Sequence, residues 1–170
     1  MRLYVPATLD DLDSADVTDV GATWTVPGRL AHAVTAGLQT SFPDEDEEGL
    51  EWQAFLAAAH DSLLRVAESP DGVRLRVVVT VEVPDDVVQV PRARTNALSQ
   101  VCVTDDVPGV EVVALHVDEP DAFLDIADVL DAAADEAPGA DAALDDAIQR
   151  VTDRDLLWYA PAELRAIPRA

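Results

Sequence analysis

The sequence contains no lysine, and all eleven of its basic side chains are arginines. Lysine forms the Schiff base of one class of covalent enzymes and contacts the phosphates in the Walker A loop. Its absence excludes both, together with a Ser–Lys dyad. The motifs Gly-x-Gly-x-x-Gly, Gly-x-Ser-x-Gly and His-Glu-x-x-His are also absent, so no dinucleotide-binding, α/β-hydrolase or zinc-protease signature is present.

Cysteine and long apolar runs are equally scarce. The single cysteine, Cys102, cannot form an internal disulfide, and its apolar surroundings are typical of a buried structural thiol. No apolar run approaches the roughly 20 residues of a membrane span. The first residues reach Asp10 and Asp11 without the apolar core of a signal peptide. We therefore expect a cytoplasmic protein that has no membrane partner.

The abundant feature is negative charge. The chain contains 34 acidic and 11 basic residues, which gives a formal net charge of −23. Such a charge repels nucleic acid and favours a partner protein with a basic surface. An ordinary alternative is that the acids, which are spread along the chain, serve solubility. We expect no nucleic-acid partner and no cofactor, and the sequence specifies no oligomeric state.

The pattern of the chain predicts an α+β fold. Its 170 residues have the length of one domain, which we place at 1–170. Strand-like and helix-like segments alternate without a long linker. We expect a mixed β-sheet of about five strands, with helices packed mainly on one face.

Three segments define this prediction most clearly. Val73 to Val83 alternates apolar and polar residues, as a half-buried strand does. The segments 100–104 and 110–117 are expected to form a hairpin, with 110–117 in the centre of the sheet because it is nearly all apolar. A helix over 44–68, capped by Asp44, should cover the sheet through its part at 50–68. The residues expected to be nearly fully buried are Leu56, Leu63, Val77, Val79, Val112 and Ile126.

One group of residues could carry chemistry. His116 lies near the end of the central strand and is followed by Asp118, just before a helix expected to begin at Pro120. Ligands often bind where strands end beside helix starts. If the strand that holds His32 were a neighbour, His32, His116 and Asp118 could together hold a metal ion or perform acid–base catalysis. The alternative is that His116 is a packed strand residue and Asp118 a helix cap.

The neighbouring aromatic pair Trp158-Tyr159 also has two interpretations. Aromatic residues are only 5% of the chain. The pair could form an interaction hot spot or stack on a ligand. It could instead anchor the C-terminal segment to the core.

Four segments together resemble a family of small acidic actinobacterial proteins known as a domain of unknown function. They are MRLYVPATLDDL at 1–12, LAHAVT at 30–35, ALHVDEP at 114–120 and LLWYAPAEL at 156–164. The resemblance covers nearly the whole chain in the same order. It implies a source and a cytoplasmic location but no activity. The chain departs from the expected pattern at Ala36-Gly37, where the family resemblance implies a proline.

These observations favour a non-enzymatic protein-interaction or regulatory module. The absence of catalytic signatures and the acidic helical faces support this interpretation. The alternative is a small metal- or anion-binding enzyme centred on His32, His116 and Asp118. The position of the two histidines in the fold distinguishes these hypotheses.

Overall fold

The computed structural model describes residues 1–69, 71–91, 97–135, 137 and 140–169. Within these ranges the helical elements are η1 (Asp10–Ser14), α1 (Ala36–Ser41), α2 (Glu47–Glu68), η2 (Asp85–Val87), α3 (Ala122–Ala133), α4 (Ala140–Thr152) and η3 (Pro161–Ala166). The strands are β1 (Arg2–Ala7), β2 (Asp16–Thr18), β3 (Gly21–Val26), β4 (Leu30–His32), β5 (Val77–Glu82), β6 (Val88–Gln89), β7 (Gln100–Val103), β8 (Val107–Asp118) and β9 (Leu156–Tyr159).

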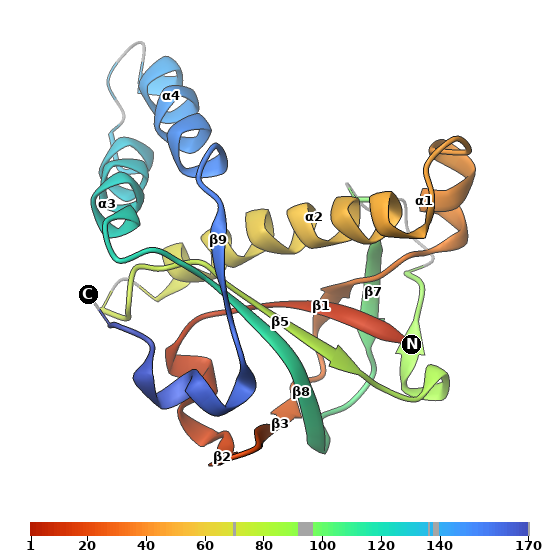
Figure 1. The fold of residues 1–170 in the computed structure, drawn as a ribbon. Coiled ribbons are helices and arrows are strands. Elements are labelled where there is room, and N and C mark those ends of the chain that lie inside the picture. The colour runs from red at the N-terminus through yellow and green to blue at the C-terminus, as the bar shows by residue number, and fades with distance from the viewer. Residues whose placement is uncertain (70, 92–96, 136, 138–139, 170) are drawn as a thin grey trace.

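The described strands form one nine-stranded sheet in the order β2-β3-β8-β5-β1-β4-β7-β6, with β9 also paired to β8 (Figure 1). Every pair among them is antiparallel. The expected α+β class is confirmed, but the strands outnumber the predicted five. Several are only two to four residues long, which is too short for an alternating pattern to show in the sequence.

The predicted hairpin between 100–104 and 110–117 is wrong. β7 pairs with β4 and β6, whereas β8 pairs with β3, β5 and β9. Three strands, β5, β1 and β4, separate β8 from β7 in the sheet. The turn-like residues between the two segments therefore connect two strands that are not neighbours in the sheet order.

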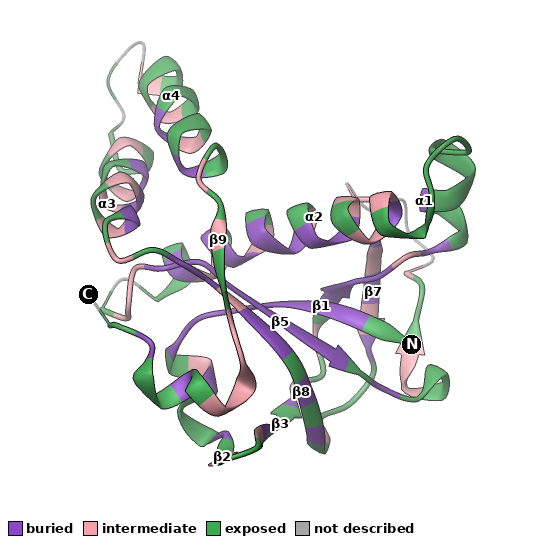
Figure 2. Ribbon diagram, in the orientation of Figure 1, coloured by how far each residue is buried: buried purple, intermediate pink, exposed green. Residues whose placement is uncertain are grey.

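One face of the sheet encloses the main hydrophobic core. Alternate residues of β1 and β5, such as Val5 and Val79, point into it. Trp24 of β3 and Val101 of β7 reach the same core from strands near opposite ends of the order. The sheet must therefore curl around this core, and Figure 2 shows its central strands as mostly buried. Leu164 of η3 closes the core.

Helix α2 covers the other face of the sheet (Figure 1). Its N-cap is Asp46, whose carboxylate accepts a hydrogen bond from the Gly49 amide at 2.9 Å, rather than the predicted Asp44. Small residues such as Ala54 and Ala58 let the helix approach Tyr4 and Val78 closely. The Ser62 hydroxyl donates to the Ala7 carbonyl and accepts from the Val77 amide, both at 2.7 Å, so it fastens the helix to two strands.

The burial predictions hold with one exception. Leu63, Val77, Val79, Val112 and Ile126 are buried as expected. Leu56 is 40% exposed, and this prediction is wrong. The apolar stripe of α2 is wider than the strip that contacts the sheet, because Leu56 lies on its flank.

Helices α3 and α4 form an antiparallel pair that stands beside the C-terminal part of α2 (Figure 1). Ile126 of α3 and Val151 of α4 pack there against Leu63 and Val66. This small third core closes one end of the face that α2 covers. Within the described residues, no helix is long and apolar enough to cross a membrane.

We predict that Leu63→Ala lowers the free energy of unfolding by about 2–5 kcal/mol, because the truncation leaves a cavity between α2 and the α3–α4 pair. Leu56→Ala is the matched control and should cost less than about 1 kcal/mol, since its side chain already meets solvent. Urea denaturation of both variants checks this. Equal losses would contradict the placement of the two leucines.

Candidate functional site

The face of the sheet under α2 is not fully covered, and two adjoining cavities remain beside the helix. The first, of about 560 Å³, lies between the N-terminal half of α2 and the sheet. The second, of about 460 Å³, lies between α2 and β9. Both are lined by Trp52, Phe55 and His116. We call the two together the groove.

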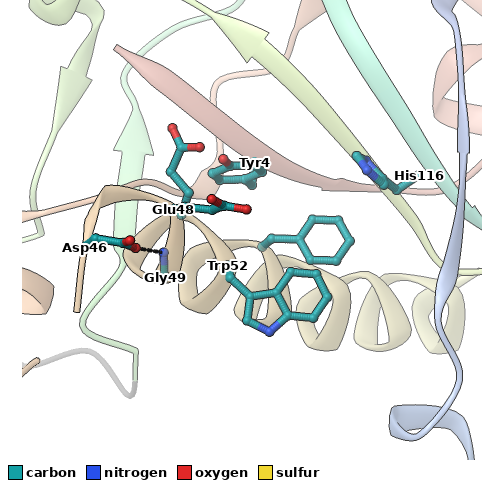
Figure 3. Close-up of a pocket in the computed structure, with 8 residues that line it drawn as sticks. Tyr4, Asp46, Glu48, Gly49, Trp52 and His116 are labelled. Atoms are coloured by element: carbon teal, nitrogen blue, oxygen red, sulfur yellow. Dashed lines mark hydrogen bonds between the residues drawn. The ribbon is translucent and has the colours of Figure 1, made fainter.

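Aromatic rings form the walls of the first cavity. Figure 3 shows Tyr4 and His116 on the sheet side and Trp52 on the helix side. Trp52 stacks on Phe55 with ring centroids 5.2 Å apart and an angle of 18° between the planes. Phe55 also meets Tyr4 and His116 edge to face, at 6.2 and 4.8 Å. Such contacts hold the rings in fixed positions.

Carboxylates line the rim of the same cavity. Asp46 caps α2, and Glu51 accepts from the Arg2 guanidinium at 3.1 and 3.2 Å. Glu48 is exposed and forms no ion pair with any described residue. Burial, with the nearby Glu51 carboxylate, raises the pKa of Tyr4 to about 12, so its phenol stays protonated.

The second cavity continues the groove and has a mixed lining, which includes the charged residues Arg76, Arg154 and Asp155. Leu56, Ala59 and Leu63 line it from α2, and Trp158 lines it from β9. Trp158 is 61% exposed, whereas Tyr159 packs against the main core. The two interpretations of this aromatic pair therefore apply to different residues: Tyr159 anchors the strand, and Trp158 faces the groove.

His116 forms part of the groove floor. Its half-buried ring leaves the buried Nδ1 atom without a hydrogen-bond partner among the described residues. Burial lowers the pKa of this imidazole below its ordinary value of 6.5. His116 is therefore neutral at pH 7, and no carboxylate in the described part of the chain orients it as one orients a catalytic histidine.

Asp118 is committed to a buried ion pair. Its carboxylate accepts from the Arg76 guanidinium at 2.8 Å and from the Arg76 backbone amide at 2.8 Å. Both side chains are almost fully buried. The same guanidinium donates to the Arg154 carbonyl at 3.0 Å, which ties the end of α4 to β5 and β8. Asp118 thus serves the fold and does not cap α3.

His32 lies apart from the groove. Two strands, β5 and β1, separate it from His116 in the sheet, which places the histidines about 14 Å apart across the strands. The condition for their convergence, neighbouring strands, is not met. His32 is fully buried, with Nδ1 2.9 Å from the Ser99 hydroxyl and Nε2 3.1 Å from the Asp61 carboxylate.

The Ser99–His32–Asp61 arrangement has the residue types of a hydrolytic triad. Its serine is buried, however, and lines neither the groove nor the small cavity beside Asp61. A nucleophile needs access to its substrate. The arrangement instead links β4, the segment before β7, and α2. No group of three metal-binding side chains occurs among the described residues.

Sequence reasoning missed most of the groove. Tyr4, Trp52 and Phe55 each look like a core residue in their own segments, and only Trp158 was considered as a possible hot spot. The scarcity of aromatic residues could have indicated the groove, because these four are half of the eight aromatic residues in the chain. His116 is the predicted site residue that does line the groove.

Comparison with known proteins gives one informative result. A family model described as a family of unknown function matches residues 1–167, in agreement with the resemblance stated above. No curated protein and no solved structure matches the chain. The comparisons therefore supply no activity, and the function must be argued from the groove.

We predict that Asp118→Ala lowers the free energy of unfolding by about 3–5 kcal/mol, because it leaves the buried Arg76 guanidinium unpaired. The double variant Arg76→Met/Asp118→Leu should lose less than the single variant, since no charge remains buried. Chemical denaturation measures both. A loss below about 1 kcal/mol for Asp118→Ala would show that the pair does not support the fold.

A second prediction concerns pH. The lowered pKa of His116 means that the unfolded chain binds this proton more readily than the folded one. The contribution of neutral His116 to stability is present above pH 6.5 and is lost as the pH falls through the lower folded pKa. Between about pH 7.5 and about pH 5, the wild type should therefore lose more stability than His116→Gln.

Urea denaturation at each pH provides the measurement. His60→Gln, at an exposed position of α2, is the matched control and should follow the wild type. If His116→Gln has the same pH dependence as the wild type, the burial of the imidazole has no energetic consequence.

Proposed function

The chain belongs to DUF6912, a family of unknown function, and we propose that it is a protein-interaction module. Its groove binds a segment of a partner protein that combines basic and apolar side chains. The single observation that carries the proposal is the row of exposed apolar side chains along the groove. Trp52, Leu56 and Trp158 line it, and all three are at least 40% exposed.

Exposed tryptophans in one groove favour binding over a structural role. Tryptophan buries a large area and is enriched among the residues that dominate binding energy. Trp24, the third tryptophan, lies in the main core and is 3% exposed. The other two instead flank the groove, and covering them removes apolar surface from water.

The charge of the molecule supports a basic partner. The net charge is −23, and Asp46, Glu48 and Glu51 line the first cavity. A complementary positive segment would be attracted from a distance and held in register. Apolar side chains of the same segment would fill the second cavity beside Leu56 and Trp158.

The catalytic alternative has less support. Of the three predicted site residues, His116 alone lines the groove, because His32 and Asp118 are engaged elsewhere. Acid–base catalysis needs a positioned imidazole whose other nitrogen is oriented by a partner. Among the described residues the Nδ1 atom of His116 has no such partner.

Tryptophan fluorescence tests the proposal directly. A synthetic peptide that contains arginine and leucine is titrated into the protein, and a peptide with glutamate in place of arginine is the control. We predict saturable binding of the first peptide, weakened by salt, and no binding of the second. Trp158→Ala should raise the Kd at least about 30-fold, as loss of a hot spot does.

Two leucines give a matched pair of controls. Leu56→Ala, inside the groove, should raise the Kd about threefold or more, while Leu124→Ala, exposed on α3 outside it, should stay within about twofold. Equal binding of the two peptides, or equal Kd values for the two leucine variants, would overturn the proposed function.

A further inference from the structure

We propose that the first cavity is a site for a guanidinium group, the side chain of an arginine in the bound segment. This inference deepens the proposed function and rests on it. It assigns the two halves of the groove different ligand chemistries. The second cavity takes apolar side chains, and the first takes a planar cation between aromatic rings and carboxylates.

The aromatic walls provide the first argument. Trp52 is 51% exposed and lines the cavity, while its stacking on Phe55 holds the indole in place. Cations bind over the faces of aromatic rings, tryptophan most strongly, and guanidinium stacks on them more readily than ammonium does. A fixed, half-exposed indole at the mouth of a cavity is therefore a suitable surface for an arginine side chain.

The carboxylates on the rim provide the second argument. Glu48 forms no ion pair with a described residue, so its charge is available to a ligand. Glu51 lies on the same rim but is already paired, because both of its oxygens accept from one nitrogen of Arg2. Carboxylates that face a stacked guanidinium form strong, directional hydrogen bonds with it.

The electrostatic balance of the cavity favours a cation despite the helix dipole. The start of α2 carries a partial positive charge of about half an elementary charge. The three carboxylates that line the cavity, Asp46, Glu48 and Glu51, outweigh this charge. Arg2 neutralises one of them, and His116 on the floor is neutral at pH 7 because burial lowers its pKa.

The shape of the site argues against other cations. A metal ion needs several ligands that converge on one point, and no such group occurs among the described residues. The cavity volume of about 560 Å³ lies in the range of pockets that bind organic ligands. Its carboxylates lie on the rim and its rings form the walls, an arrangement that matches a planar group with donors along its edge.

The probe for this inference is a capped arginine, N-acetyl-arginine N-methylamide, titrated into the whole protein. Its neutral counterpart with citrulline has nearly the same shape, and the capped lysine has the same charge. We expect the arginine compound to quench Trp52 fluorescence saturably. The lysine compound should bind about tenfold more weakly, and the citrulline compound should not bind measurably.

Two variants locate the site. Glu48→Gln and Trp52→Leu should each weaken binding of capped arginine about fivefold or more, whereas Glu111→Gln should not change it, since Glu111 is an exposed carboxylate outside the groove. For Trp52→Leu, heat of binding replaces fluorescence as the readout. Unfolding of each variant is followed by circular dichroism, so that loss of fold is not mistaken for loss of the site.

The outcomes separate this inference from the proposed function. If the arginine–leucine peptide binds but capped arginine binds no better than capped lysine or citrulline, the guanidinium site is overturned and the interaction module stands. Tetramethylammonium binding as tightly as capped arginine would also overturn it, because it would show a site for any cation. If capped arginine binds but the peptide does not, the guanidinium site stands and the wider proposal fails.

Discussion

The extra residue in β8 is the constraint on which the groove depends. Thr80 of β5 faces Ala114, but the next residue, Val81, faces Val112, so Val113 has no counterpart. Before this bulge, Val112 points into the enclosed core; after it, His116 points to the side of α2. Strict alternation would put both residues on one face. The bulge therefore gives α2 a polar residue to cover and leaves the core apolar.

The position of α2 then determines which polar residues of the sheet are shielded from solvent. Ser62 fastens the helix to β1 and β5, and beside it Asp61 covers His32 completely. Towards its start the helix presents the larger rings of Trp52 and Phe55, and the cavities open there beside His116. Helix α2 thus buries His32 in a hydrogen-bonded network and leaves His116 at the floor of the groove.

The sequence was informative where a pattern is long and regular. Helix α2 lies close to its predicted range, whereas β5 is shorter than the predicted strand at 73–83 and is buried on both faces because α2 covers the side expected to meet solvent. The β8 bulge cannot be recognised in the sequence. Nearly every residue from Val110 to Val117 is apolar, so the change of face does not alter the apolar pattern. Pairings such as Arg76 with Asp118, or His32 with Ser99, join residues distant in the chain and depend on strand order. Strand order does not follow from local propensity.

The uneven use of charge within the fold supports the proposed preference of the first cavity for a cation. Seven described arginines form ion pairs with carboxylates of the same chain. Five of these arginines pair around η1 or between α3 and the end of α4, and Arg76 pairs with Asp118 beside β5 and β8. Because the cations are engaged there, the surplus carboxylates determine the field at the first cavity, where Arg2 is the paired cation. The proposed guanidinium site is consistent with this distribution, since a cation there would meet both the aromatic walls and Glu48, which has no ion-pair partner in the described part of the chain.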